Sequence, residues 1–325
     1  VITPWTDHPE LMPRNRIVTR HFLNLLVVVG GGFTLTIVAM FLARKNIRLG
    51  RGDRKGAFRL AAWYFVLSWA ARLLLAHHVG NFDAEANIIF EQAAVPLLYA
   101  ALIWILYIAL EPSVRRRWPE YLISWTRLLA GDLRNPMVGR DVLAGALGGA
   151  LLALVAHVVN GLPAWFHLAG QTPINVNTPA VGPTQKFIGY VLSNFTGPIT
   201  AGLTMLFLFF ILRVAIRRYW LAVVLFSALN LVLYAGNENV IAEGTGAVVS
   251  VVLVAVVLLR FGLLGLIAAY TVQNFLEGFP IALDPSRWYF ARGFVPVLIV
   301  LALAIYGFRI SLGARPVFGF LTAEE

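Results

Sequence analysis

Apolar runs of about 20 residues recur along the whole chain, and short polar or charged stretches separate them. A helix rises about 1.5 Å per residue, so each run is long enough to cross a hydrocarbon core of about 30 Å. The pattern therefore predicts an all-α fold, a polytopic transmembrane bundle of about nine spans. The expected spans cover residues 21–43, 57–79, 85–110, 142–165, 185–212, 219–235, 245–259, 263–279 and 294–312.

The run 245–279 is the weakest boundary, because Arg260-Phe261-Gly262 interrupts it and both halves are short. Whether it forms one kinked span or two stays open. Two glycine-rich runs, Gly30-Gly31-Gly32 and GALGGA at Gly145–Ala150, predict small faces at which helices pack closely.

Charge is unevenly distributed between the loops. If the loop 44–59 is placed inside, the inner segments hold 19 of the 26 Lys and Arg residues and the outer segments hold 6. The positive-inside preference then predicts a bacterial cytoplasmic (inner) membrane protein with Val1 outside and Glu325 inside. Residues 1–20 form an outer N-terminal segment, 21–312 the bundle and 313–325 a cytoplasmic tail. Because the chain opens with Val1, we expect either a removed leader or the tail of a longer polypeptide.

The stretch Glu111–Asp141 is too charged to cross a membrane. Within it, Leu122, Trp125, Leu129 and Leu133 recur at helical spacing, opposite Arg127 and Arg134. This pattern predicts an amphipathic helix on the cytoplasmic surface over about residues 119–134. We expect five arginines of the stretch Glu111–Asp141 to contact anionic phospholipids or to couple the bundle to a partner. These residues are Arg115, Arg116, Arg117, Arg127 and Arg134.

Ionisable side chains inside spans are costly and are therefore functional candidates. Arg72 and Glu91 fall at similar depth in consecutive spans, which predicts a structural ion pair. Further polar side chains lie in the outer half of the expected bundle and could line a cavity open to that side. The candidates are His77, His78, Gln92, His157, Asn160, Asn194, Asn230, Glu238, Asn274 and Glu277. Ordinary helix–helix hydrogen bonds and headgroup contacts are the alternative explanation of the same residues.

Composition and motifs exclude several classes of chemistry. Hydrophobic residues make up 59% of the chain and charged residues 13%, and there is no cysteine. The net charge of +10 is explained by topology, so we expect no nucleic acid partner. The sequence contains no HExxH, GxSxG or P-loop motif, and His77 and His78 are adjacent, which points them to different faces. We therefore assign no metal, no cofactor and no catalytic residue.

Three segments resemble a known family: ARKNIRLGRGDRKGAFRLA (43–61), YIALEPSVRRRWPEYLISWTRLLAGDLRNPMVGRDVL (107–143) and RFGLLGLIAAYTVQNFLEGFP (260–280). They are similar to the C-terminal multi-span membrane region of acidobacterial-type bacterial Ser/Thr protein kinases. The resemblance implies a cytoplasmic kinase domain in the parent polypeptide, and an outer segment that ends near Pro4-Trp5-Thr6. The kinase domain itself is absent from this chain, and the resemblance assigns no ligand.

Three functions stay open. The first is a non-catalytic sensor or anchor module coupled to a cytoplasmic signalling domain. The second is an accessory subunit of a larger membrane complex, of photosynthetic or respiratory type. The third is an intramembrane enzyme or transporter that uses the outer cavity. Transporters are often built from inverted repeats and broken helices, and the interruption at 260–262 is the one hint of this kind in the sequence.

Overall fold

The computed structural model describes residues 29–165, 178–234, 240–282 and 284–313. Within these ranges the regular structure is helical and no strand is present, which confirms the all-α prediction. The elements are α2 (Gly31–Arg48), α3 (Arg54–Leu75), α4 (Phe82–Arg117), the 3-10 helix η2 (Pro119–Tyr121), α5 (Ile123–Leu129), α6 (Pro136–Trp165), α7 (Thr178–Val181), α8 (Thr184–Ala215), α9 (Tyr219–Tyr234), α10 (Val240–Glu277) and α11 (Phe290–Ser311).

Six helices in the described part of the chain are long and apolar enough to cross a membrane, which fits a membrane protein. The candidate segments are Arg54–Leu75, Phe82–Arg117, Pro136–Gly161, Thr184–Ala215, Gly244–Glu277 and Phe290–Ser311. α9 adds a shorter apolar helix. α2 covers the second half of the first expected span, and residues 21–28 lie outside the described residues. A total of nine spans therefore remains a prediction.

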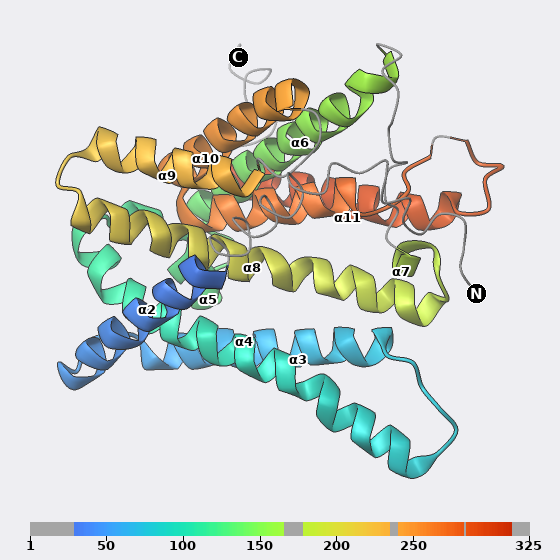
Figure 1. The fold of residues 1–325 in the computed structure, drawn as a ribbon, viewed down its shortest axis with the longest axis horizontal. Coiled ribbons are helices and arrows are strands. Elements are labelled where there is room, and N and C mark those ends of the chain that lie inside the picture. The colour runs from blue at the N-terminus through green and yellow to red at the C-terminus, as the bar shows by residue number, and fades with distance from the viewer. Residues whose placement is uncertain (1–28, 166–177, 235–239, 283, 314–325) are drawn as a thin grey trace, which may run out of the picture.

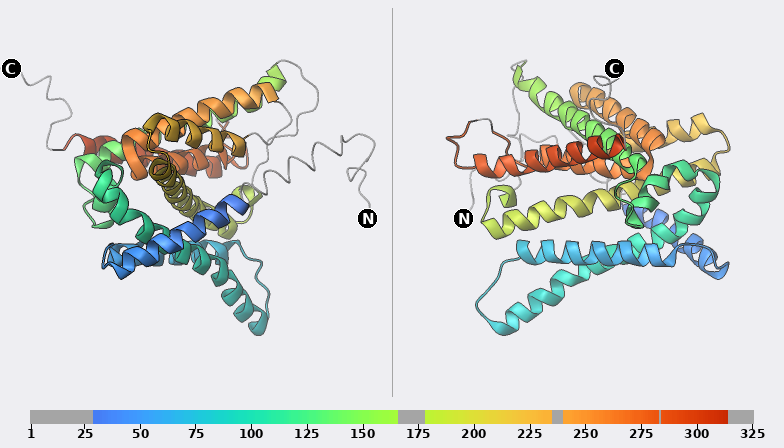
Figure 2. Two further views of the ribbon diagram at one scale, coloured as in Figure 1. Left: turned by 60° about the vertical axis from the view of Figure 1, so that its left-hand side comes forward. Right: turned by 180° about the vertical axis from the view of Figure 1, so that it is seen from behind.

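α8 lies between two groups of helices (Figures 1 and 2). On one side, α3 and α4 contact α8, and α2 packs against α4. On the other side, α10 contacts α8, and α6 packs between α10 and α11. The main core holds fully buried side chains such as Ile103 of α4, Phe207 of α8 and Leu258 of α10. The middle of the bundle is thus built from α4, α8 and α10.

Glycines let α6 and α10 approach at backbone distance. A Cβ on Gly145 would lie 2.3 Å from the carbonyl oxygen of Gly265, and one on Gly149 would lie 2.2 Å from that of Ala269. The close packing predicted for the GALGGA run is therefore confirmed. The matching prediction for Gly30, Gly31 and Gly32 is wrong, because nothing lies within 4 Å of a Cβ at any of the three among the described atoms.

α10 reverses direction at Gly262, whose φ of 66° and ψ of −158° are not helical. Before this point, Gly246 contacts Val159 and Val257 contacts Gly148, so α10 approaches the start of α6 as it proceeds. After it, Gly265 contacts Asp141 near the start of α6, and Ala269 contacts Gly149 further along the same helix. The two limbs of α10 therefore run in opposite directions along α6. The interruption predicted at 260–262 is confirmed, and α10 consists of two helical limbs joined at Gly262.

The sequence sets the ends of α3 and α4 by local chemistry. The Asp53 side chain accepts the Gly56 N–H at 2.8 Å and caps α3. The Asn81 side chain accepts the Asp83 N–H at 3.0 Å and caps α4. Acidic residues follow in the first turn of α4, and its last turn holds three arginines. Acidic residues at the N-terminus and basic residues at the C-terminus interact favourably with the helix dipole, and they stabilise both ends of this 36-residue helix.

Candidate functional site

The ends of the helices that carry basic loops meet at one end of the bundle, which we call the basic end. Asn46 near the end of α2 donates to the carbonyl oxygens of Ile108 and Ala109 in α4, at 2.9 and 3.2 Å. The Tyr306 hydroxyl of α11 donates to the Leu133 carbonyl at 2.6 Å. The basic loops predicted to share one side of the membrane therefore lie together.

The chain between α4 and α6, residues 118–135, is the centre of the basic end, and we call it the bridging segment. The predicted surface helix over 119–134 is wrong in extent, because α5 covers only Ile123–Leu129 and a turn with Gly131 at φ 88° follows. It is also wrong in placement. Leu122 and Trp125 are 2% and 3% exposed, so the apolar face packs into the bundle, whereas Leu133 is exposed. The bridging segment therefore fills the space between the helix ends.

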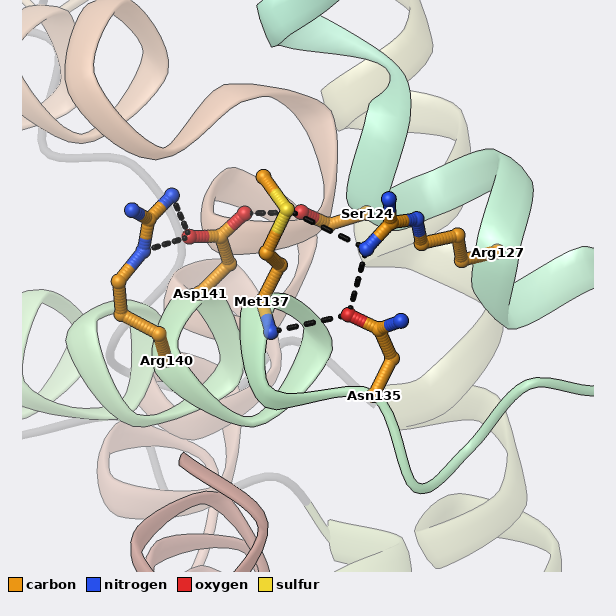
Figure 3. A network of polar contacts seen from close by, with 6 residues as sticks. All are labelled: Ser124, Arg127, Asn135, Met137, Arg140 and Asp141. Carbon is orange, nitrogen blue, oxygen red and sulfur yellow. Dashed lines mark hydrogen bonds and ion pairs between the residues drawn. The ribbon is translucent and has the colours of Figure 1, made fainter. Parts of the chain in front are cut away.

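A buried carboxylate fastens this segment to α6. Asp141 is 1% exposed, and its carboxylate accepts a short hydrogen bond from the Ser124 hydroxyl of α5 (Figure 3). The other carboxylate oxygen accepts from Nε and Nη2 of Arg140, both at 2.9 Å. A buried carboxylate is tolerated when it is paired and hydrogen-bonded in this way. Losing either partner would leave a costly charge inside the protein.

A second set of contacts fixes the turn after α5. Nη1 of Arg127 donates to the Asn135 side-chain oxygen at 2.7 Å and lies 3.3 Å from the Met137 sulfur (Figure 3). The same Asn135 oxygen accepts the Met137 N–H at 3.1 Å at the start of α6. Arg127, expected to face lipid or a partner, is thus half-buried and structural, while Arg134 is exposed.

Glu111 joins the α2–α3 turn to α4. It is 3% exposed, and its two oxygens accept the Asp53 N–H at 3.3 Å and Nη1 of Arg115 at 3.1 Å. Arg115 is therefore partly committed to an internal ion pair. Arg116 and Arg117 are exposed on the last turn of α4. Of the five predicted coupling arginines, these two and Arg134 are free to meet a partner or lipid.

Aromatic rings connect the bridging segment to α8 and α9. Tyr121 packs edge-on against Phe209, and Phe209 packs in turn against Tyr219 and Phe226. Burial raises the pKa of Tyr121 to about 12, and its hydrogen bond with Tyr219 adds to the rise. Tyr121 is therefore neutral at physiological pH. The arrangement holds the start of α9 against the bridging segment.

The residue at which α10 reverses also lies against the bridging segment. A Cβ on Gly262 would lie 2.5 Å from the Tyr121 carbonyl oxygen and 2.9 Å from two further backbone atoms of Tyr121. Glycine is needed here both for the positive φ and for this close approach. The bridging segment thus contacts or bonds α3, α4, α6, α8, α9, α10 and α11.

The expected ion pair between Arg72 and Glu91 is not formed. The ion pairs among the described residues are His78–Glu85, Arg115–Glu111, Arg140–Asp141 and Arg287–Asp284. Arg72 Nε is buried without a hydrogen-bond partner in the described structure, and Glu91 is exposed. α3 and α4 diverge toward the loop that joins them (Figure 1), and the two side chains lie in different environments.

The predicted outer polar residues fall into separate environments. His157, Asn160 and Glu277 are exposed, Gln92 and Asn274 are half-buried, and Glu238 lies outside the described residues. Asn194 and Asn230 are buried and donate to carbonyl oxygens one turn earlier, at 2.7 and 2.8 Å. For these two asparagines the structural explanation is sufficient. The outer cavity remains a prediction, and no three His, Asp or Glu side chains in the described chain are grouped so that they could hold a metal ion.

His78 forms the most defined contact at the opposite end of the bundle. Its Nδ1 lies 2.8 Å from the Glu85 carboxylate and its Nε2 lies 2.8 Å from the Leu73 carbonyl oxygen. Both partners only accept, so both ring nitrogens donate when the ring is protonated. The Glu85 hydrogen bond is the main reason that the pKa of His78 lies above its ordinary value. Glu85 also accepts the Val79 N–H at 2.6 Å, and the group closes the α3–α4 loop.

Comparison of the chain with protein-family models, with curated proteins and with solved structures finds no significant match. The functional argument therefore depends on the geometry of the chain itself. Sequence reasoning treated Glu111 and Asp141 as loop charges and missed their burial. The available signal was that each is an acidic residue within a stretch otherwise dominated by arginine.

Proposed function

We propose that the chain is a non-catalytic integral membrane sensor or anchor module whose basic end is coupled to a cytoplasmic signalling domain. The resemblance to the membrane region of bacterial Ser/Thr kinases supports a kinase as that domain, and the positive-inside preference supports a cytoplasmic basic end. The observation that carries the proposal is the bridging segment, in which contacts from seven helices converge on residues 118–135.

Such convergence suits transmission because a shift of any one helix changes contacts of the same short segment. Arg116, Arg117 and Arg134 project from this region and are exposed, so they are available to a partner domain. Rigid internal contacts with exposed charges beside them are the arrangement expected of a coupling element. The stimulus would act on the outer polar residues, which lie at the opposite ends of the same helices.

The first test isolates the protein from its native membrane in mild detergent and measures intact mass and peptide coverage. We expect a signalling domain, either continuous with the chain or retained in stoichiometric amount. A species near 35.8 kDa that purifies with no signalling domain would contradict the proposal.

The second test measures autophosphorylation in native vesicles. Asp141→Ala breaks the contact between Ser124 and α6, so it should change the kinase rate at least about twofold even though it lies outside the kinase. Glu120→Ala removes an exposed charge from the same segment and is the matched control. Equal rates in the wild type and in both variants would separate the bundle from any signalling role.

An accessory subunit is the second candidate, and the exposed apolar faces of α3 and α11 favour it. In the most apolar 18-residue stretch of α11 only 17% of the residues are buried inside the protein, compared with 67% in the corresponding stretch of α10. Phe294, Leu298, Leu301, Ile305 and Phe308 follow one face of α11 and are exposed. Lipid covers such a face in a monomer, whereas another subunit covers it in a complex. Native electrophoresis in mild detergent distinguishes the two, because a subunit would migrate with a defined larger assembly.

A further inference from the structure

The corner where α8 turns into α9 combines unpaired arginines with aromatic rings, and we call it the α8–α9 corner. It consists of Trp118, Arg213, Arg217, Arg218, Tyr219 and Trp220. Arg217 and Arg218 are exposed, and Arg213 is half-buried. None of the three arginines forms an ion pair with a carboxylate in the described chain. The corner therefore holds three positive charges without internal compensation.

Arg213 is held in a fixed position. Its guanidinium lies 5.6 Å from the ring centroid of Trp118 and 5.2 Å from that of Tyr219. Both rings are themselves held by edge contacts, Trp118 with Phe210 and Tyr219 with Phe209. Among the described residues its guanidinium donates one hydrogen bond, from Nη1 to the Arg217 carbonyl oxygen at 3.1 Å. An arginine has five N–H donors, so most of them stay available to an anion at a position fixed by cation–π contacts.

The surface that adjoins these charges is apolar. Trp220 and Val224 are 58% and 56% exposed, and they lie one helical turn apart on α9. Leu221 and Leu225 repeat the same spacing beside them and are also exposed. The arginines thus lie at the end of an exposed apolar surface on α9, formed by Trp220, Leu221, Val224 and Leu225, which we call the apolar wall. A small soluble anion would use the charges only, whereas an amphiphile would use the charges and the wall together.

We propose that the α8–α9 corner binds the headgroup phosphate of an anionic phospholipid, with one acyl chain lying along Trp220 and Val224. Charge complementarity fixes the sign of the headgroup, and the adjacent wall selects a lipid over a free phosphate. This site differs from two of the arginines predicted to contact lipid, because Arg127 donates to Asn135 and Arg115 to Glu111. Basic sites between transmembrane helices are a known kind of headgroup site for anionic lipids.

The test titrates the delipidated protein in detergent with phosphatidylglycerol and, separately, with phosphatidylcholine of the same chains, and counts bound lipid by native mass spectrometry. We expect preferential binding of phosphatidylglycerol. The double variant R217Q/R218Q should weaken it about fivefold for each arginine removed. The matched control R48Q/R51Q removes the same charge from exposed positions of the α2–α3 turn and should change the affinity less than about twofold. Equal losses in both double variants would show diffuse attraction and overturn the proposal.

A second pair of variants keeps the charge constant. Tyr219→Leu removes one ring beside Arg213 and should weaken phosphatidylglycerol binding, whereas Tyr219→Phe keeps the ring and should preserve most of it. Unchanged binding in Tyr219→Leu would overturn the role of the fixed guanidinium. Inorganic phosphate and glycerophosphoglycerol serve as competitors that lack acyl chains. Full displacement of the lipid by either at millimolar concentration would overturn the amphiphile site in favour of a simple anion site.

Discussion

Gly262 of α10 lies directly against the backbone of Tyr121 in the bridging segment, with a Cβ position only 2.5 Å from the Tyr121 carbonyl oxygen. This contact joins the point at which α10 reverses to the segment on which the other helix ends converge. It places a residue that must be glycine at the centre of the basic end. The first prediction follows from this contact.

Gly262→Ala should destabilise the protein. A φ of 66° with a ψ of −158° is a conformation that almost only glycine adopts, and a side chain there costs about 1–3 kcal/mol before any clash is counted. The new methyl group would also displace Tyr121. Thermal unfolding in detergent measures the effect, and Gly244→Ala is the control, because nothing lies within 4 Å of a Cβ there among the described atoms. Equal melting temperatures for the two variants would contradict the assigned backbone conformation.

Ser124→Ala and Asp141→Ala should each lower the free energy of unfolding by about 1–3 kcal/mol, because each leaves a buried polar group without its partner. Their effects should not add in the double variant, since both remove the same hydrogen bond. Chemical unfolding of the four proteins in a double-mutant cycle measures the coupling. A coupling energy near zero would show that the contact contributes nothing to stability.

Arg72→Ala and Glu91→Ala should have additive effects on stability. The two side chains share no ion pair, and Glu91 is exposed on α4. Residues without a common partner usually add within about 0.3–0.5 kcal/mol. The same cycle applied to this pair serves as the negative control for Ser124 and Asp141. A coupling above about 1 kcal/mol would restore the ion pair expected from the sequence.

The α3–α4 loop should be better protected at a pH between the lowered pKa of Glu85 and the raised pKa of His78 than at higher pH. The folded pKa of His78 is raised above its ordinary value of 6.5, mainly by Glu85. The stabilisation contributed by protonated His78 is therefore fully present below the pKa that this histidine has in the unfolded chain. It is lost as the pH rises through the higher pKa that His78 has in the folded protein. The other ionisable groups nearby in the loop and the first turn of α4 are His77 and Asp83.

Hydrogen exchange of residues 77–85, corrected for intrinsic rates, measures this effect. Protection in the wild type should fall as the pH rises above 6.5, whereas His78→Gln should show no such step. His77→Gln is the matched control, because its neighbour keeps both hydrogen bonds. A step that persists in His78→Gln would assign the titration to another group.

The sequence predicted the helices, the small packing face at Gly145–Ala150 and the gathering of basic loops at one end. These features follow from hydrophobic periodicity and charge counts, which are local properties of the chain. An interruption at 260–262 was also predicted, because an arginine and a glycine break an otherwise apolar run, but the choice between one kinked span and two was left open.

Contacts between residues distant in the sequence were not predicted. Arg72 and Glu91 have matched depth, but the angle between α3 and α4 decides whether they meet, and no local pattern encodes that angle. The amphipathic pattern of the bridging segment is real, since Leu122 and Trp125 do share a buried face. Periodicity shows that a face is buried, but it does not distinguish a membrane surface from a gap between helix ends. Asp141 illustrates the same limit, because its burial depends on Ser124 and Arg140 lying beside it.

The reversal in α10 has a consequence for the order of assembly. At about 1.5 Å per residue, the limb before Gly262 (240–261) is about 33 Å long and the limb after it (263–277) about 22 Å, so only the second limb is short for a bilayer core of about 30 Å. Both limbs depend on the glycine face of α6, and α10 also contacts α8. During synthesis α6 and α8 leave the ribosome first, so the surface that accepts the two limbs exists before they emerge. α11 follows and packs against α6, where Gly139 and Gly307 lie at the contact. The chain order therefore brings the two limbs of α10 to a helix surface that already exists.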